Sequence, residues 1–200
     1  EMTKRAISTS VYIMAPLMIG LAVIAEDLVS LILTDKWLPC VFFLRIFCIA
    51  YMFEPIHTAN LNAIKALGRS DLFLKLEIWK KIVGMTLLAS TIWISVEAMA
   101  YSYLLACVLA QIINSWPNKK LLHYSYLEQL KDIFPAILLA LFMGACIYPI
   151  THINLNRIVI VALQIIGGMI IYILGSVVLK FDSFKYLADI VKSIFLKRSR

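Results

Sequence analysis

Long apolar runs constrain the fold of this chain more than any other feature of its sequence. A helix rises about 1.5 Å per residue, so roughly 20 mostly apolar residues cross a hydrocarbon core about 30 Å thick. Six stretches qualify, at about residues 7–33, 39–64, 71–96, 98–116, 132–150 and 157–179. Hydrophobic residues make up 62% of the 200 positions and charged residues only 16%, which is more apolar surface than a soluble core hides. The sequence therefore predicts an all-α, polytopic membrane helix bundle.

The six helices suggest four segments. Residues 1–117 hold four transmembrane helices, and residues 132–179 hold two trailing ones. Between them, leucines alternate with charged and tyrosyl positions over residues 118–131, which indicates a cytoplasmic interfacial helix. In residues 180–200, apolar positions recur at three- and four-residue spacing opposite lysines. That pattern predicts a basic amphipathic tail lying on an anionic leaflet.

The distribution of Lys and Arg predicts orientation, because cytoplasmic loops collect positive charge. If successive loops between the predicted helices lie on alternate sides of the membrane, one side holds most of the basic residues. The other side holds Lys36 and Arg157. Both ends are therefore expected in the cytoplasm. The net charge of +7 lies mainly along the membrane margin, which argues against a nucleic-acid partner.

Motifs of metal sites and enzymes are missing from the sequence. The four cysteines, at positions 40, 48, 107 and 146, stand singly and show no C-x-x-C or other metal-ligand spacing. There is no G-x-S-x-G, H-E-x-x-H or phosphate-binding loop. We therefore expect no metal, no cofactor and no enzymatic activity, and the available chemistry is binding and charge movement.

Basic residues concentrate unexpectedly in the third predicted helix. Lys75 can reach the interface by extending its side chain, but Lys80 and Lys81 lie about 15 Å along the helix from its start. One interpretation is that the first two turns protrude and both lysines lie at the interface. The other is that they line a cationic cavity suited to a diphosphate, with Glu77 on the same helical face.

The second predicted helix carries polar residues around a proline. Glu54, His57 and Asn60 follow at three-residue steps, and Pro55 removes a helical hydrogen bond. Discontinuous polar helices are where transporters place coupling-ion sites, so these three residues are candidates for ion coupling. Glu54 could instead pair with a basic residue as a structural clamp. Arg45 lies on the opposite side of the helix, where pairing is favoured over substrate contact.

A resemblance extends over residues 15–84. Its features are the P-x-x-x-G-L opening at 16–21, the Lys36 and Trp37 pair, and the A-L-G-R turn at 66–69. On these residues the chain resembles bacterial polysaccharide exporters, the lipid-linked oligosaccharide flippases of the multidrug/oligosaccharidyl-lipid/polysaccharide superfamily. Thr34 departs from the pattern, which has a glycine there. The matching residues cover about a third of the chain.

The resemblance implies two helical lobes that face each other across a cationic cavity and alternate access between leaflets of the bacterial inner membrane. Its cargo would be an undecaprenyl-diphosphate-linked sugar repeat for a capsule, exopolysaccharide or O-antigen. The chain opens with "EMTKRAIST" and resembles the C-terminal part of such a protein. Its expected partners are the lipid-linked oligosaccharide, membrane lipids and an N-terminal lobe of the same chain.

These observations lead to a flippase hypothesis with named residues. The alternatives are a drug or metabolite antiporter, which would need an acidic aromatic cavity, and a membrane polymerase or acyltransferase, which would need a long outer loop. A purely structural subunit would leave the charges at membrane depth unexplained. The candidates for substrate binding are Lys80, Lys81, Arg45 and Lys75, and those for ion coupling are Glu54, His57 and Asn60.

Overall fold

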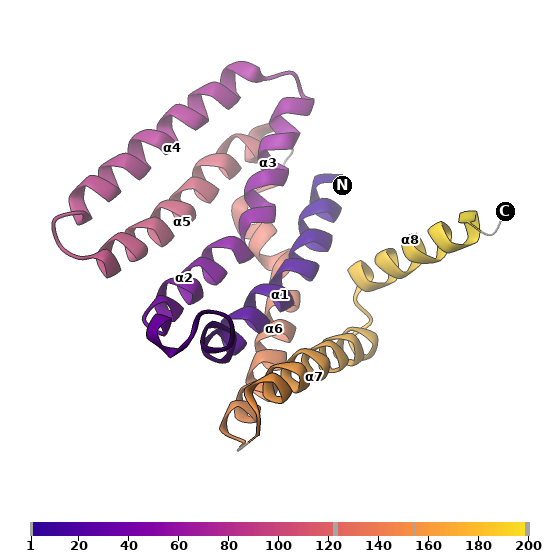
Figure 1. Cartoon of the computed structure of the whole chain (residues 1–200). Coiled ribbons are helices and arrows are strands. Elements are labelled where there is room, and N and C mark those ends of the chain that lie inside the picture. Colours follow the sequence, from indigo (N-terminus) through magenta and orange to yellow (C-terminus); the bar gives the residue numbers. More distant parts are fainter. Residues whose placement is uncertain (1, 122–123, 154, 199–200) are drawn as a thin grey trace.

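A computed structural model describes residues 2–121, 124–153 and 155–198. Within these ranges the regular structure is entirely helical (Figure 1), which confirms the predicted all-α class. Short 3-10 helices occur at η1 (Asp35–Trp37) and η2 (Tyr148–His152). The α-helices are α1 (Met2–Leu33), α2 (Cys40–Met52), α3 (Glu54–Ala66), α4 (Ser70–Thr91), α5 (Val96–Leu121), α6 (Tyr126–Ile147), α7 (Arg157–Val178) and α8 (Asp182–Arg198).

Five helical segments of the described chain are long and apolar enough to cross a membrane. They are Met2–Leu33, Cys40–Ala66, Val96–Lys119, Tyr126–His152 and Arg157–Val178. The remaining predicted span, residues 71–96, does form a helix, α4 (Ser70–Thr91), which is 22 residues long. This helix is not among the five because its first twelve residues carry five charged side chains: Asp71, Lys75, Glu77, Lys80 and Lys81.

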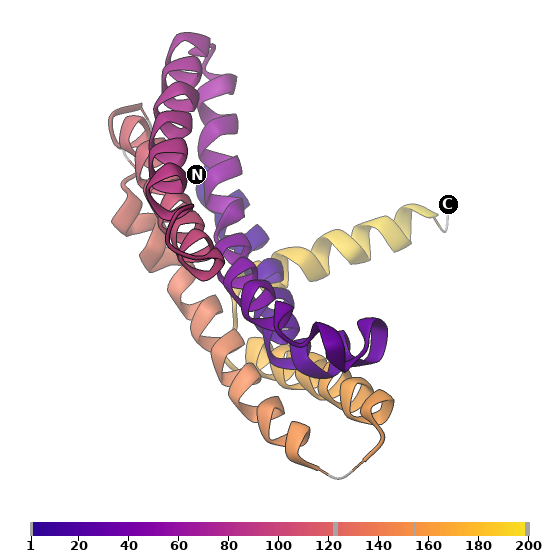
Figure 2. The ribbon, with the colours of Figure 1, turned by 60° about the vertical axis from the view of Figure 1, so that its left-hand side comes forward.

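The long helix α1 is the centre of the bundle and packs against α2, α3, α6 and α7 (Figures 1 and 2). At its first turn Lys4 Nζ donates to Asp132 of α6 at 2.8 Å, and past its last turn Arg157 of α7 pairs with Asp35 at 2.8 Å. The hydroxyl of Ser30 and the guanidinium of Arg157 hold the pKa of Asp35 below its usual value. A helix of 32 residues is about 48 Å long. The two pairs therefore lie at opposite ends of a helix whose length is comparable to a bilayer with its headgroups, about 40 to 45 Å.

Close packing joins α1 to α6 and α7 between these ends. A Cβ added at Gly144 of α6 would lie 2.7 Å from Cγ2 of Ile19, so the glycine permits the approach of α1. Nearer the N-terminal end of α1, Tyr12 donates its hydroxyl to Ser176 Oγ at 2.6 Å, and Tyr172 donates to the carbonyl of Tyr12 at 2.8 Å. The aromatic hydroxyls in this apolar seam are thus satisfied within the bundle.

The predicted discontinuity in the second span is present. α2 ends at Met52 and α3 begins at Glu54, with Phe53 between them at φ −96° and ψ −1°. Pro55 lies in the first turn of α3, where its missing N–H leaves no helical bond unmade, whereas a continuous helix would lose one. The break therefore follows from the position of the proline.

Helices α4 and α5 form an antiparallel hairpin that extends beside the bundle (Figure 1). None of the residues of α4 is buried. Its contacts are mainly with α5, with fewer to α3. One face of α4 therefore remains open in the described structure.

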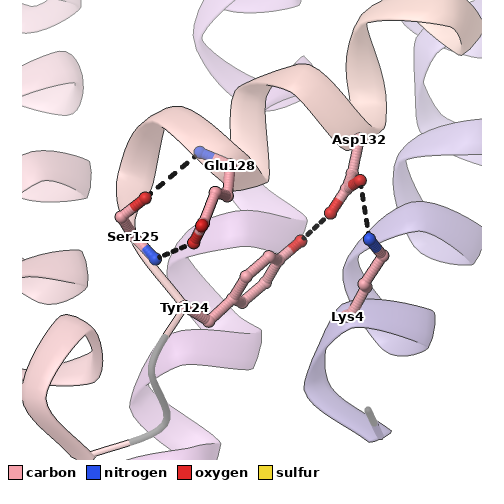
Figure 3. Close-up of polar contacts among 5 residues, drawn as sticks. All are labelled: Lys4, Tyr124, Ser125, Glu128 and Asp132. Carbon is pink, nitrogen blue, oxygen red and sulfur yellow. Dashed lines mark hydrogen bonds and ion pairs between the residues drawn. The ribbon is translucent and has the colours of Figure 1, made fainter.

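The structure differs from the separate interfacial helix predicted at residues 118–131. Helix α5 continues to Leu121, and α6 begins at Tyr126 with a capping box in which Ser125 and Glu128 exchange hydrogen bonds (Figure 3). Residues 122–123 lie outside the described ranges. Tyr124 donates its hydroxyl to Asp132 at 2.7 Å; burial, with a further contribution from that carboxylate, raises the pKa of Tyr124. These bonds fix the start of α6. The alternating pattern of residues 118–131 therefore spans the end of α5 and the start of α6, not one separate helix.

Most of the predicted amphipathic tail, residues 180–200, forms the helix α8 (Asp182–Arg198). Phe184 and Leu187 pack against the core formed by α1, α6 and α7. Beyond this contact α8 runs away from the bundle in both views (Figures 1 and 2). Residues 199–200 of the predicted tail lie outside the described ranges, and its placement on a leaflet stays a prediction.

Candidate functional site

Polar side chains gather in the bundle where the first half of α3 and the middle of α4 meet the C-terminal part of α5 and the start of α6. They form two groups that share helices α3 and α5. The amide cluster comprises Asn60, Ser115, Asn118 and Gln129. The histidine–lysine cluster comprises His57, Lys80, Glu77 and Asn114.

In the amide cluster, Asn60 uses its full hydrogen-bonding capacity. Its Nδ2 donates to Ser115 Oγ at 3.0 Å and to Gln129 Oε1 at 2.8 Å. Its Oδ1 accepts from Asn118 Nδ2 at 2.7 Å and from Gln129 Nε2 at 3.2 Å. The four side chains are at most 1% exposed. The cluster therefore joins α3, α5 and α6, and the predicted coupling role of Asn60 would require one of these bonds to break.

The histidine–lysine cluster joins α3, α4 and α5. Asn114 Nδ2 lies 2.8 Å from Nδ1 of His57, and Lys80 Nζ lies 3.5 Å from Nε2 of the same ring. Lys80 also donates to Glu77 Oε1, three residues earlier on α4. The side chain of Lys80 is only 9% exposed, although α4 is the most open helix of the hairpin. The site thus holds a mostly buried ammonium beside a titratable ring.

The other predicted cationic residues do not join this cluster. Lys75 and Lys81 of α4 are exposed. Arg45 of α2 pairs with Glu26 of α1 at 3.0 Å and donates to the carbonyl of Ala22 at 3.1 Å. The alternative in which Arg45 pairs with a neighbouring helix is therefore what the geometry shows, and its substrate contact stays a prediction.

Glu54 faces a different surface from His57 and Asn60. It is exposed and accepts a hydrogen bond from Thr58 at 3.5 Å. It lines a groove of about 500 Å³ between the first half of α1 and α3, together with small and hydroxylated residues that include Ser10. The three candidate coupling residues are therefore separated: Glu54 in the groove, His57 against α4 and α5, and Asn60 in the amide cluster.

A larger apolar groove of about 1020 Å³ lies between α1, α6, α7 and α8. Its walls are almost wholly hydrocarbon, with Gln164 and Lys192 among the few polar residues that line it. Such a surface on membrane-length helices suits contact with lipid chains. No group of three His, Cys, Asp or Glu side chains converges as metal ligands among the described residues.

Comparison with known proteins bears on the first helix. Residues 1–42 match a family model described as polysaccharide biosynthesis protein. The match covers α1, η1 and the start of α2. The chain is thus similar to polysaccharide biosynthesis proteins. No curated protein and no solved structure matches the chain. Together with five membrane-length helices, the match supports a membrane protein of polysaccharide biosynthesis at this coarse level.

Proposed function

We propose that this chain is part of a transporter that moves a lipid-linked sugar across the membrane during polysaccharide biosynthesis. The family match supports the pathway, and the membrane-length helices support the location. The proposed cargo is an undecaprenyl-diphosphate-linked repeat unit, exported by alternating access with ion coupling. The proposed setting is the bacterial inner membrane, with both ends of the chain in the cytoplasm and an N-terminal lobe completing the cavity. The proposal assigns no enzymatic step to the chain.

The single observation that carries this proposal is the position of Lys80. Burying an ammonium costs free energy unless the charge is paired and hydrogen-bonded, so a mostly buried lysine usually serves a site or a partner. Lys80 is 9% exposed and its ion-pair partner, Glu77, is on its own helix. A diphosphate offers the charge-assisted hydrogen bonds that such a lysine can form.

A second candidate is an antiporter of cationic drugs or metabolites. The groove between α1 and α3 favours it, because Glu54 is exposed there among the hydroxyls of Ser10 and Thr58. A lone carboxylate with hydroxyl neighbours suits an organic cation better than a diphosphate. The two candidates therefore assign the substrate to different faces of α3.

Polymer export by the full-length protein, in a strain that lacks its own exporter, separates these candidates. Lys80→Met is expected to abolish surface polysaccharide without lowering the protein level, because it removes the buried cation. Lys81→Met is the matched control, since it removes the neighbouring exposed lysine. Normal polymer with both lysines replaced would exclude them from the mechanism. Loss of drug resistance in Glu54→Gln, with polymer unchanged, would support the antiporter.

Coupling is tested by transport across a pH step. If Glu54 carries the proton, Glu54→Gln removes the proton dependence of transport. If the dependence persists in this variant, coupling lies elsewhere in the protein.

A further inference from the structure

The ring of His57 lies between two hydrogen-bond donors. Asn114 Nδ2 faces Nδ1 at 2.8 Å and Lys80 Nζ faces Nε2 at 3.5 Å. A neutral imidazole has one acceptor nitrogen and one N–H, so it cannot accept from both. In one of the two contacts, the ring nitrogen must therefore be the donor and its partner the acceptor.

The amide of Asn114 resolves the conflict. Its Oδ1 is buried and has no hydrogen-bond partner, and exchanging the oxygen and nitrogen of the amide by a half-turn brings this acceptor to His57. His57 Nδ1–H then donates to Asn114, and Nε2 accepts from the ammonium of Lys80. The structure thus favours a neutral His57 in its Nδ1–H tautomer, held by Lys80 on one side.

The charges around the ring determine what protonation does. Lys80 and Glu77 face it from α4, Glu54 lies one turn earlier on α3, and Asn114 on α5 is uncharged. The residues of α1 that line its groove with α3, Met2, Thr3, Ala6, Ser10 and Met14, carry no titratable side chain. With His57 neutral, the charges of Lys80 and Glu77 cancel, and Glu54, which also acts on the ring, adds one negative charge. With His57 protonated, the cluster gains one positive charge and Nε2–H points at another cation.

We propose that His57 and Lys80 form a proton-linked binding site for a phosphate-type anion. An oxygen of the anion would accept from both Nε2–H and the Lys80 ammonium, which replaces their repulsion by two charge-assisted hydrogen bonds. An anion would approach this site beside α4, which packs mainly on α5 and leaves its outer face open. The inference rests on the proposed function, because it supplies the site at which the diphosphate of the cargo and a coupling proton meet.

Proton binding at His57 and anion binding at the site are thermodynamically linked in this proposal. If the anion binds the protonated form better, acid tightens anion binding and the anion raises the proton affinity of His57 by the same factor. Release of the proton on one side of the membrane would then release the cargo headgroup as well. Lys80 would return to Nε2 when the site empties.

The test is binding of inorganic pyrophosphate to the purified full-length protein in detergent at pH 5.5 and pH 7.5. Sulfate is a second probe, because its charge does not change over this range. We expect binding of both to be at least about tenfold tighter at the lower pH, since one linked proton contributes up to tenfold per pH unit. His57→Gln and Lys80→Met are expected to lose this dependence, whereas the exposed controls His152→Gln and Lys81→Met keep it.

Binding that does not change with pH in the unmodified protein would overturn the inference, and so would a pH dependence that persists in His57→Gln. A second measurement needs no variant. Nitrogen-15 NMR of labelled histidine at pH 7.5 is expected to show His57 protonated at Nδ1, and protonation at Nε2 alone would overturn the tautomer argument. Polymer export by the strain tests the proposed function separately, so linkage can fail while export succeeds.

Discussion

Replacing Asn60 by alanine tests whether the amide cluster holds three helices together. The side chain is fully buried and makes four hydrogen bonds. In membrane proteins such bonds average about 0.6 kcal/mol, because the unfolded chain in the membrane finds other partners. Four of them give about 2 kcal/mol, and values typical of soluble proteins would give more. The figure of about 2 kcal/mol applies here, because Asn60 lies in a membrane-length segment.

The partners of Asn60 are not all left unsatisfied by this substitution. Gln129 keeps its bond to the carbonyl of Tyr124, and Asn118 keeps its bond to the backbone carbonyl of residue 60. The loss should therefore stay near 2 kcal/mol, which corresponds to about a 30-fold change in the unfolding constant.

Asn62→Ala is the matched control for this measurement. It removes the same side chain two positions later, where the residue is exposed, and should change stability by no more than about 0.5 kcal/mol. The assay is equilibrium unfolding of the full-length protein in mixed micelles, with both variants measured together. If Asn60→Ala unfolds at the same detergent composition as Asn62→Ala, the cluster does not stabilise the bundle.

Other substitutions address local features, each measured by the same unfolding assay. Tyr124→Phe should cost about 1 kcal/mol, because its hydroxyl loses a 2.7 Å bond to a carboxylate of α6; an unchanged midpoint would contradict this. Gly144→Ala should cost about 1 to 3 kcal/mol, since its Cβ would lie 2.7 Å from the branched carbon Cγ2 of Ile19. Gly84→Ala, where nothing lies within 4 Å, should be neutral or stabilise by up to about 1 kcal/mol; equal losses at both glycines would exclude the packing argument. Gly68→Ala should destabilise by about 1 kcal/mol because φ is 69°, and no change would show that this turn can relax.

Local signals made much of the fold predictable. The lengths of the apolar runs indicate membrane helices without any knowledge of their partners. Pro55 marks the break between α2 and α3, since its effect on the helix is local. The sequence Ser125 to Glu128 is a capping-box pattern that marks the start of α6. The interpretation of residues 118–131 as one helix overlooked that signal in favour of periodicity.

The side on which each lysine of α4 lies could not be predicted locally. Lys80 is mostly buried and Lys81 is exposed, and adjacent positions on a helix point about 100° apart. Which of the two faces inward depends on how α4 rotates against α3 and α5. The helix is charged and apolar on several sides, so no apolar stripe fixes that rotation from the sequence.

The members of the amide cluster on α5, Ser115 and Asn118, were missed although a signal for them was present. Gln111, Asn114, Ser115 and Asn118 recur at three- and four-residue spacing in an otherwise apolar helix, and all are at most 4% exposed. A polar stripe on such a helix indicates a buried polar contact rather than a lipid-facing surface. Its partner Gln129, in contrast, lies 69 residues from Asn60. Only the packing of α3 and α6 against the shared helices α1 and α5 brings these two residues together.

The two clusters differ in whether their hydrogen-bonding atoms are all engaged by other protein groups. In the amide cluster, Asn60 has every donor and acceptor engaged by protein, so a ligand there would have to replace a bond that already exists. In the histidine–lysine cluster, one terminal atom of the Asn114 amide has no hydrogen-bond partner, and the ring of His57 lies between that amide and the ammonium of Lys80. That arrangement changes its hydrogen bonds when a single proton arrives, and it includes Lys80 and Glu77 of α4, a helix that packs mainly on α5. Charge movement is therefore expected at His57 and Lys80, while Asn60 keeps the helices that carry them in place.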